Sequence, residues 1–537
     1  MAKHNHLTSD KTPKYAAGPK AVRIASKMAF DAMPPWKALK VLKSLNQKSG
    51  IDCPGCAWPD PEKRSKLGEF CENGVKAIAE EAQHKLADAD FFKHYSINSL
   101  RNKSDYWLGQ QGRLAQPMII RDGNSKYEPI AWEEAFTLIG DHLKSLDHPD
   151  QAVFYTSGRT SNEAAFLYQL FVRKYGTNNL PDCSNMCHES SGVALTETVG
   201  IGKGSVTLED FNHAEVILII GQNPGTNHPR MLSSLEKAKQ NGAKIIVINP
   251  LKEAALVKFK NPQKISGWIG SGTEIADHYL QIKINQDVAL FKAWLKLLLE
   301  NEECLDQDFI QSKTAGFEEL KHDLSSYQLD ELIAATGLPE SQILETAQLL
   351  KANNKIIACW AMGLTQHVNA VDNIREVVNL LLVKGSIGKP GAGTCPVRGH
   401  SNVQGDRTMG IWERPTKEWT AKLRDTFGFN PPESPGYNVV ESIDAMKSGK
   451  VKFFMAMGGN LLSAAPDTPV TEEALQNCEL TVHVSTKLNR SHLAPGKISL
   501  ILPCLGRTDK HIQNGKEQVV TVENSMGVVH SSAGVLT

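Results

Sequence analysis

The sequence contains no long hydrophobic run. Its apolar stretches, such as residues 216–220 and 380–383, are far shorter than the roughly 20 residues that a membrane-spanning helix requires. Residues 1–27 are polar and basic, without the apolar core of a secretory signal and without a twin-arginine motif. We therefore expect no membrane span and a cytoplasmic location.

The chain also has no net charge. Lys and Arg together number 59, and Asp and Glu together also number 59. A neutral chain has no global electrostatic field that would draw it to nucleic acid or to an anionic membrane. We therefore expect no nucleic acid partner, and any other partner has to be recognised through a local site.

The ten cysteines are not expected to form a disulfide framework, because the chain is long and shows no export signal. Cys53 and Cys56 form a C-x2-C motif, and Cys71 follows after a short loop. Iron–sulfur clusters and structural zinc both use such ligands. The nearest further candidate for zinc, His84, lies in a helical pattern well beyond Cys71, so the spacing favours an iron–sulfur cluster. The alternative is an incidental cysteine pair with a buried structural thiol at Cys71.

Short apolar runs alternate with helical patterns through most of the chain. Strands are expected at Ala152–Tyr155, Val216–Ile220, Lys244–Ile248 and Ile356–Trp360, and helices at Val75–Asp90, Glu163–Tyr175, Leu232–Gln240 and Asp287–Glu300. The least regular stretch, residues 412–437, is expected to be a long surface excursion. This alternation predicts a parallel α/β fold. A length of 537 residues indicates about three or four domains.

One pattern of strand, glycine turn, helix and strand occurs twice. The first copy runs from strand 216–220 through Gly221, Asn223 and Pro224 to a strand ending at Asn249, and the second from strand 453–457 through Gly458 and Asn460 to a strand ending at Ser485. A glycine turn lets backbone amides approach a phosphate, and a polar residue after the next strand can bind a nucleoside. The repeat predicts two nucleotide-like ligands or one large ligand with two ends, although each turn alone is more typical of an ordinary tight connection.

Residues 360–410 hold the longest motif of the chain. It begins WAMGLTQHVNA and continues with NLLLVKGSIGKPGAGTCPVRGHSNVQGDRTMG. This motif resembles the signature of the bis-molybdopterin-guanine-dinucleotide oxidoreductases, especially formate dehydrogenases, and the segments GTNN, MCH and GQNP precede it in the family's order. The segments CPGCAWP and CENG resemble the YdeP-like branch of that family.

The resemblance implies a multidomain α/β fold, with doubly wound αβα domains around a pseudo-two-fold cleft and a small N-terminal iron–sulfur domain. We expect the tail and the iron–sulfur domain in residues 1–126. One dinucleotide-binding domain is expected in residues 127–182 plus 400–510, and the other in residues 183–399. Residues 511–537 are expected to be a truncated end that lacks the family's C-terminal barrel-like cap.

The resemblance also implies the chemistry. Cys187 falls where the family supplies the protein ligand to molybdenum, and His188 and Arg398 fall where formate dehydrogenases keep the two residues that face the substrate. A guanidinium can hold a small carboxylate such as formate through two parallel hydrogen bonds, and a histidine can relay the proton. The expected cofactors are a molybdenum bis-molybdopterin guanine dinucleotide and one iron–sulfur cluster of the 4Fe-4S type. The residues expected to bind the dinucleotides are Gly221, Asn223, Pro224, Asn249, Gly363, Gln366, Gly458, Asn460 and Ser485.

Two positions depart from the family's cluster motif. Asp60 stands at the third ligand position, where it could complete the set of Cys53, Cys56 and Cys71 or be a solvated residue, and Asn73 stands in place of a lysine. The predicted function is a formate dehydrogenase-like oxidoreductase that oxidises a small anion and passes electrons through the cluster to a redox partner protein. A molybdenum-free scaffold subunit and an oxidoreductase for a different substrate remain the alternatives.

Overall fold

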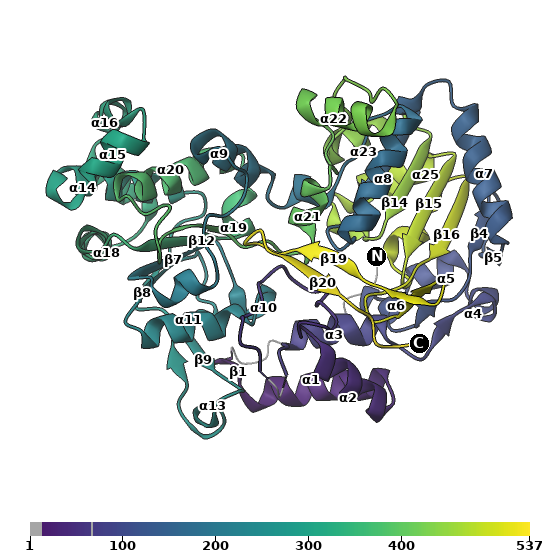
Figure 1. Ribbon diagram of the computed structural model, residues 1–537, viewed down its shortest axis with the longest axis horizontal. Coiled ribbons are helices and arrows are strands. Elements are labelled where there is room, and N and C mark those ends of the chain that lie inside the picture. The colour runs from purple at the N-terminus through teal and green to yellow at the C-terminus, as the bar shows by residue number, and fades with distance from the viewer. Residues whose placement is uncertain (1–12, 66–67) are drawn as a thin grey trace.

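A computed structural model describes residues 13–65 and 68–537 of the chain. Two β-sheets, each covered by helices on both faces, form two αβα units that lie side by side (Figure 1). The N-terminal helices α1 (Gly18–Ala32) and α2 (Pro35–Ser44) lie at the bottom of that view. The fold is therefore mixed α/β, as the alternation of apolar runs and helical patterns predicted.

The first unit is built on a five-stranded parallel sheet with the order β11-β8-β7-β12-β13. Its strands are β7 (Val216–Ile220), β8 (Lys244–Ile248), β11 (His278–Leu280), β12 (Ile356–Trp360) and β13 (Gly393–Pro396). The residues of β7 and β12 are all buried, because helices cover both faces of the sheet. One face packs against α9 (Glu189–Val199), α14 (Asp287–Leu299), α17 (Leu329–Thr336), α18 (Glu340–Ala352) and α20 (Ala370–Val383), and the other against α11 (Met231–Gln240) and α12 (Ala254–Val257).

The second unit is built on a six-stranded sheet with the order β5-β4-β16-β15-β14-β6. Its strands are β4 (Met118–Arg121), β5 (Glu128–Pro129), β6 (Ala152–Thr156), β14 (Phe453–Met457), β15 (Leu480–Ser485) and β16 (Ile498–Pro503). The four strands from β6 to β16 run parallel, and β4 and β5 add an antiparallel edge. The chain thus enters this sheet at Met118, before the domain boundary expected at residue 126, leaves it after β6 and returns at β14.

Helices also cover both faces of the six-stranded sheet. One face packs against α7 (Trp132–Ser145) and α8 (Asn162–Tyr175), and the other against α23 (Val439–Lys447), α24 (Leu461–Ala464) and α25 (Thr468–Asn477). The two sheets therefore have the same layered construction, although the first is made from one continuous stretch of chain and the second from two.

The two glycine turns are formed in the same way in the two sheets. The backbone N–H of Gly221 donates to the carbonyl oxygen of Ile248 at 3.0 Å, and that of Gly458 donates to the carbonyl oxygen of Val484 at 2.8 Å. Both glycines have positive φ, 54° and 70°. The repeat found in the sequence is thus a structural repeat, and it puts one glycine turn at the carboxyl ends of the parallel strands in each sheet.

One expected helix needs correction, and one irregular stretch is more regular than expected. The helical pattern from Val75 to Asp90 is interrupted, because α3 (Glu72–Glu81) ends early and Leu86–Ala87 forms strand β2, which pairs with β3 (Arg113–Leu114). The irregular stretch 412–437, expected to be a long surface excursion, is mostly exposed or half-buried, but part of it is regular, because it contains α22 (Lys417–Phe427). Its N-terminus is stabilised by Thr416, whose side-chain oxygen accepts a hydrogen bond from the backbone N–H of Trp419 at 3.2 Å.

The end of the chain joins the N-terminal segment to the second unit. Strands β19 (Val520–Glu523) and β20 (Val529–Ser532) form a hairpin, and β19 packs against α8. Beside it the backbone N–H of Ser525 donates to the carbonyl oxygen of Ala57 at 2.9 Å. Within residues 13–65 and 68–537, no helix has both the length and the apolar character needed to cross a membrane.

Candidate functional site

Two adjoining cavities lie at the carboxyl ends of the two sheets. The first has a volume of about 890 Å³ and is lined by Gly221, Asn223, Asn249 and Gly363. The second has a volume of about 1400 Å³ and is lined by Gly458, Asn460 and Ser485. Both are lined by the same eight residues where they meet, and we call this set the shared wall: Lys76, Ala77, Glu80, Arg159, Cys187, Met362, Gln366 and His400.

The cavities thus bring together most of the residues that the sequence assigned to nucleotide binding. Gln366 lines both cavities, and Cys187 lies where they meet. Pro224 differs from the others, because it is buried at the start of α10 (Pro224–Asn227) and lines neither cavity. Its fixed φ suits the first position of a helix, so its contribution is to the local backbone.

The glycine turn of the first unit packs directly on α19 (Met362–Thr365). The backbone N–H of Gly363 donates to the carbonyl oxygen of Gly221 at 3.0 Å. A Cβ atom at position 221 would lie 2.5 Å from the carbonyl carbon of Gly363, closer than real Cβ atoms approach other heavy atoms. Glycine at both positions therefore allows the two backbones to touch.

The same short helix holds the loop that carries Cys187. The hydroxyl of Thr365 donates to the carbonyl oxygen of Cys187 at 2.6 Å, and the side-chain amide of Gln366 donates to that of Met186 at 2.8 Å. Burial raises the pKa of the Cys187 thiol, while the charge of Arg398 and the backbone N–H of Gly399 act in the opposite direction. The thiol is thus fixed in place and next to a permanent positive charge.

His188 lies behind the cavity wall. Its Nδ1 is 3.0 Å from the hydroxyl of Ser191, its Nε2 is 3.2 Å from the carbonyl oxygen of Val397, and the residue lines neither cavity. Burial and the nearby charge of Arg398 lower the pKa of His188 well below its ordinary value. In this arrangement the imidazole is neutral, and both of its nitrogens are engaged by protein groups.

Arg398 is also turned away from the cavities. Its Nε donates to the side-chain oxygen of Gln404 at 2.9 Å, and its Nη2 donates to the carbonyl oxygen of Gly202 at 3.0 Å. The residue is 5% exposed and lines neither cavity. The structure therefore brings Cys187, His188 and Arg398 close together, as the sequence implied, but only Cys187 faces the open space.

The three clustered cysteines, Cys53, Cys56 and Cys71, face the first cavity. A Cβ atom on Gly74 would lie 2.9 Å from the sulfur of Cys53 and 3.8 Å from that of Cys71, so glycine at this position leaves room for the sulfur of Cys53. Burial and the neighbouring thiols raise the pKa of Cys53 to about 12 and those of Cys56 and Cys71 to about 11. Buried neutral thiols around one space suit a metal centre, which would bind them as thiolates.

Asp60 lies at the edge of this cysteine group but is already paired. Its Oδ1 is 2.7 Å from Nη1 of Arg230, and its Oδ2 is 3.3 Å from Nη2 of Arg64. Ligand atoms of Asp52, Asp60 and His530 lie within 4.8 Å of one another. Because Asp52 in turn pairs with Arg507 at 3.0 Å, arginines neutralise both carboxylates without a metal ion.

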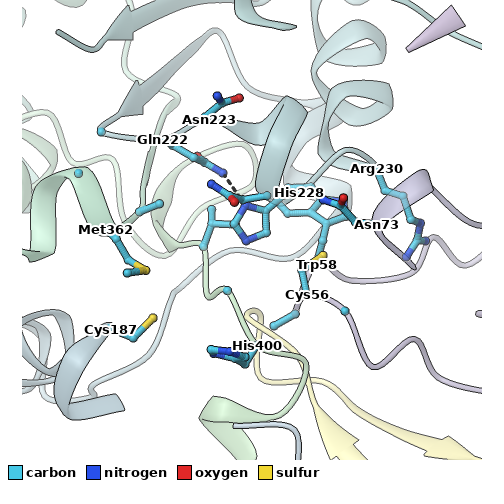
Figure 2. Close-up of a pocket in the computed structure, with 18 of the residues that line it drawn as sticks. Cys56, Trp58, Asn73, Cys187, Gln222, Asn223, His228, Arg230, Met362 and His400 are labelled. Carbon is cyan, nitrogen blue, oxygen red and sulfur yellow. Dashed lines mark hydrogen bonds between the residues drawn. The ribbon is translucent and has the colours of Figure 1, made fainter. Parts of the chain in front are cut away.

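Figure 2 shows Arg230 and Asn73 on the same side of the first cavity as Cys56, away from Cys187. The side-chain amide of Asn73 donates to the carbonyl oxygen of Thr226, so it contacts the first unit. Lys76, one turn later on α3, belongs to the shared wall. A basic group therefore reaches the junction of the cavities from the cysteine segment even though position 73 holds asparagine.

Sequence reasoning did not identify four further residues of the site: Lys76, Arg159, Asp287 and His400. Asp287 is the first residue of α14 and lines the first cavity. Burial raises its pKa from 3.8 to about 6. His400 lies inside the long glycine-rich motif, so the sequence could have marked it as a candidate site residue. Arg159 and Asp287 lie in no motif, and the sequence around them does not single them out.

The chain matches the family described as "Molybdopterin oxidoreductase" over residues 113–494. The chain belongs to this family. The match includes all the strands of the first unit and most of those of the second. The protein is accordingly an oxidoreductase, and its family implies a molybdenum–pterin cofactor.

Curated relatives of this molybdopterin oxidoreductase include a Mycobacterium tuberculosis protein named as an uncharacterized oxidoreductase, which is 56% identical over 526 residues. That alignment covers 97% of this chain and 68% of the relative. Protein YdeP of Escherichia coli is 47% identical over 502 residues, covering 92% of this chain and 66% of YdeP. The chain therefore spans about two thirds of the length of these relatives.

A more distant relative is the alpha subunit of an F420-dependent formate dehydrogenase of Methanococcus maripaludis, 29% identical over 435 residues, with 77% of this chain and 60% of that subunit covered. Among solved structures, acetylene hydratase from Pelobacter acetylenicus matches with a TM-score of 0.60 and 20% identity, covering 80% of this chain and 59% of that one. This second likeness concerns the fold alone.

Proposed function

We propose that this molybdopterin oxidoreductase holds a molybdenum bis-molybdopterin guanine dinucleotide, with Cys187 as the protein ligand of the metal, and oxidises a small anion such as formate. The observation that carries this proposal is the pair of adjoining cavities. Each extends from the glycine turn of one structural repeat, and the two meet at Cys187. Two dinucleotides, one in each cavity, would therefore bring their pterins together at this thiol.

The lining of each cavity suits a dinucleotide. The glycine turns at Gly221 and Gly458 line the two cavities, where the lack of a side chain would let a pyrophosphate approach the backbone, and Asn249 and Ser485 follow the next strands, where a nucleoside would lie. Asp287 adds a carboxylate, which accepts hydrogen bonds from guanine N–H groups. Such bonds would stabilise its charged form and offset the effect of burial.

The metal, when bound, accepts two electrons from the substrate, and the residues of the chain hold and orient the reactants. Cys187 would bind the metal as a thiolate, and the fixed charge of Arg398 behind it favours that form. His188 hydrogen-bonds Ser191 and the carbonyl oxygen of Val397, so its contribution is to hold the wall in place. The name of the formate dehydrogenase relative supports formate as the substrate.

Electrons would leave through an iron–sulfur cluster in the N-terminal segment. Cys53, Cys56 and Cys71 would supply three thiolates, and Asp60 would hold Arg230 beside the cluster. The positive charge of Lys76 near the electron path would favour the reduced cluster. The acceptor would be a cytoplasmic redox protein, since electrons that leave through a cluster require no nicotinamide site in this chain.

The proposal is tested by formate-dependent reduction of an artificial electron acceptor. Cys187→Ala should abolish the activity, because the metal loses its protein ligand. Cys304→Ala is the matched control, since Cys304 hydrogen-bonds the carbonyl oxygen of Leu298 and lines neither cavity, and it should leave activity within about twofold. Full activity of Cys187→Ala would refute the assignment of the ligand.

A further inference from the structure

His400 carries an unsatisfied buried nitrogen at the junction of the two cavities. The residue belongs to the shared wall with Cys187, and its Nδ1 is buried without a hydrogen-bond partner in the part of the chain that the structure describes. The hydroxyl of the next residue, Ser401, is buried without a partner as well and lines the first cavity. A buried polar atom without a partner, in a residue that lines a cavity, indicates a ligand that would satisfy it.

Arg159 supplies a free positive charge at the same place. It lies in the shared wall, is exposed to the cavities, and its guanidinium makes no hydrogen bond or ion pair with any residue of the described ranges. Its charge is one cause, after burial, of the lowered pKa of His400, about 4. The imidazole is therefore neutral near pH 7 and can share a hydrogen bond beside the cation.

The backbone around these two residues is fixed by a set of hydrogen bonds. The N–H of Asn402 donates to the carbonyl oxygen of Gly158 at 2.8 Å, and its side-chain amide donates to that of Thr160 at 2.6 Å. Arg507 donates to the carbonyl oxygen of Arg159 at 3.0 Å. A Cβ atom on Gly158 would lie 2.9 Å from Cβ of His400, so the two loops are in contact. The site is thus preorganised from residues far apart in the sequence.

The geometry points to a small-anion subsite formed by Arg159 and His400, in which the guanidinium holds the charge of a carboxylate such as formate and the imidazole accepts or donates one further hydrogen bond in front of Cys187. This inference rests on the proposed function for the identity of the anion. It assigns substrate contact to two residues other than His188, whose two ring nitrogens are engaged by Ser191 and Val397, and Arg398, whose Nε and Nη2 donate to Gln404 and Gly202. Figure 2 shows His400 and Cys187 among the residues around this space.

The test measures formate binding by calorimetry on the purified full chain, with its molybdenum content determined in the same samples. Arg159→Gln should weaken binding by about tenfold or more, since a charge-assisted hydrogen bond is lost. His400→Ala should also weaken binding, and His400→Gln should recover most of the affinity because an amide can replace the hydrogen bond. Arg424→Gln, which removes an arginine that lines neither cavity, is the matched control and should bind formate as the wild type does.

The outcomes separate this inference from the proposed function. Wild-type affinity in both Arg159→Gln and His400→Ala would overturn the subsite, as would loss of molybdenum from Arg159→Gln, which would make this arginine a cofactor ligand. Wild-type protein without molybdenum would instead refute the proposed function, and the calorimetry on the same protein would still test the anion subsite. Weakened formate binding in the two variants at unchanged molybdenum content would support it.

Discussion

The two glycine turns provide a matched pair of substitutions, because they are equivalent in the repeat but differ in their surroundings. Gly221→Ala and Gly458→Ala each place an alanine at positive φ, 54° and 70°, at a cost of roughly 1 kcal/mol. A Cβ at position 458 has its nearest neighbour, Cβ of Ser157, at 3.3 Å. A Cβ at position 221 would be 2.5 Å from Gly363 and 2.6 Å from the backbone nitrogen of Leu364.

The difference between the two variants follows from those distances. Ordinary contact begins near 3.4 Å, so Gly221→Ala has to push the backbone of α19 outward, whereas Gly458→Ala needs only a small adjustment. Overpacking of this kind costs about 1–3 kcal/mol. We expect a total loss of about 2–4 kcal/mol for Gly221→Ala and about 1 kcal/mol for Gly458→Ala. Because α19 holds the Cys187 loop through Thr365 and Gln366, Gly221→Ala should also lower formate turnover.

Urea unfolding of both variants measures this difference. Midpoints are the quantity to compare, since a chain with two αβα units need not unfold in a single step. Gly221→Ala should have the clearly lower midpoint for the transition of the first unit. Equal shifts of the two variants would refute the role assigned to the contact between Gly221 and Gly363.

Two further predictions concern the cysteine group and Asp287. Cys56→Ser should reduce bound iron and labile sulfide while molybdenum remains, because the thiols and Cys187 would hold separate centres; unchanged iron and sulfide would contradict the cluster assignment. Burial raises the pKa of Asp287 from 3.8 to about 6, so its charge destabilises the folded state above pH 6 and this cost disappears as the pH falls below 4. Asp287→Asn, in protein made without molybdenum, should therefore raise the unfolding free energy at pH 7 by up to about 3 kcal/mol and leave it nearly unchanged at pH 4. Equal effects at both pH values would contradict this assignment.

The strands of the fold could be predicted from the sequence, because buried parallel strands are continuous apolar runs. Val216–Ile220, Lys244–Ile248 and Ile356–Trp360 have the predicted bounds, and α14 ends one residue before the predicted Glu300. The helix expected from Val75 to Asp90 failed for a tertiary reason. Leu86–Ala87 forms a strand because it pairs with Arg113–Leu114. Because that partner is distant in the sequence, the hydrophobic pattern around Leu86 does not reveal the pairing.

The candidate site was only partly accessible to sequence reasoning. The glycine turns and Cys187 lie in motifs, and the structure puts them on the cavity walls. The direction in which a side chain points could not be predicted from the motifs. His188 and Arg398 lie in the expected loops, but their hydrogen bonds to neighbouring groups turn the side chains away from the cavities. The Nδ1 of His400 likewise has no hydrogen-bond partner among the described residues. The sequence alone does not show which groups surround an atom in the fold.

The central claim is that the two adjoining cavities hold two dinucleotides around one metal. The direct measurement is the content of molybdenum and of guanine nucleotide released by acid hydrolysis from the purified chain. The account predicts molybdenum together with about two guanine nucleotides for each metal atom, one from each cavity. Protein that contains neither molybdenum nor guanine nucleotide after expression in a molybdenum-replete host that makes the cofactor would contradict it and would indicate a scaffold role.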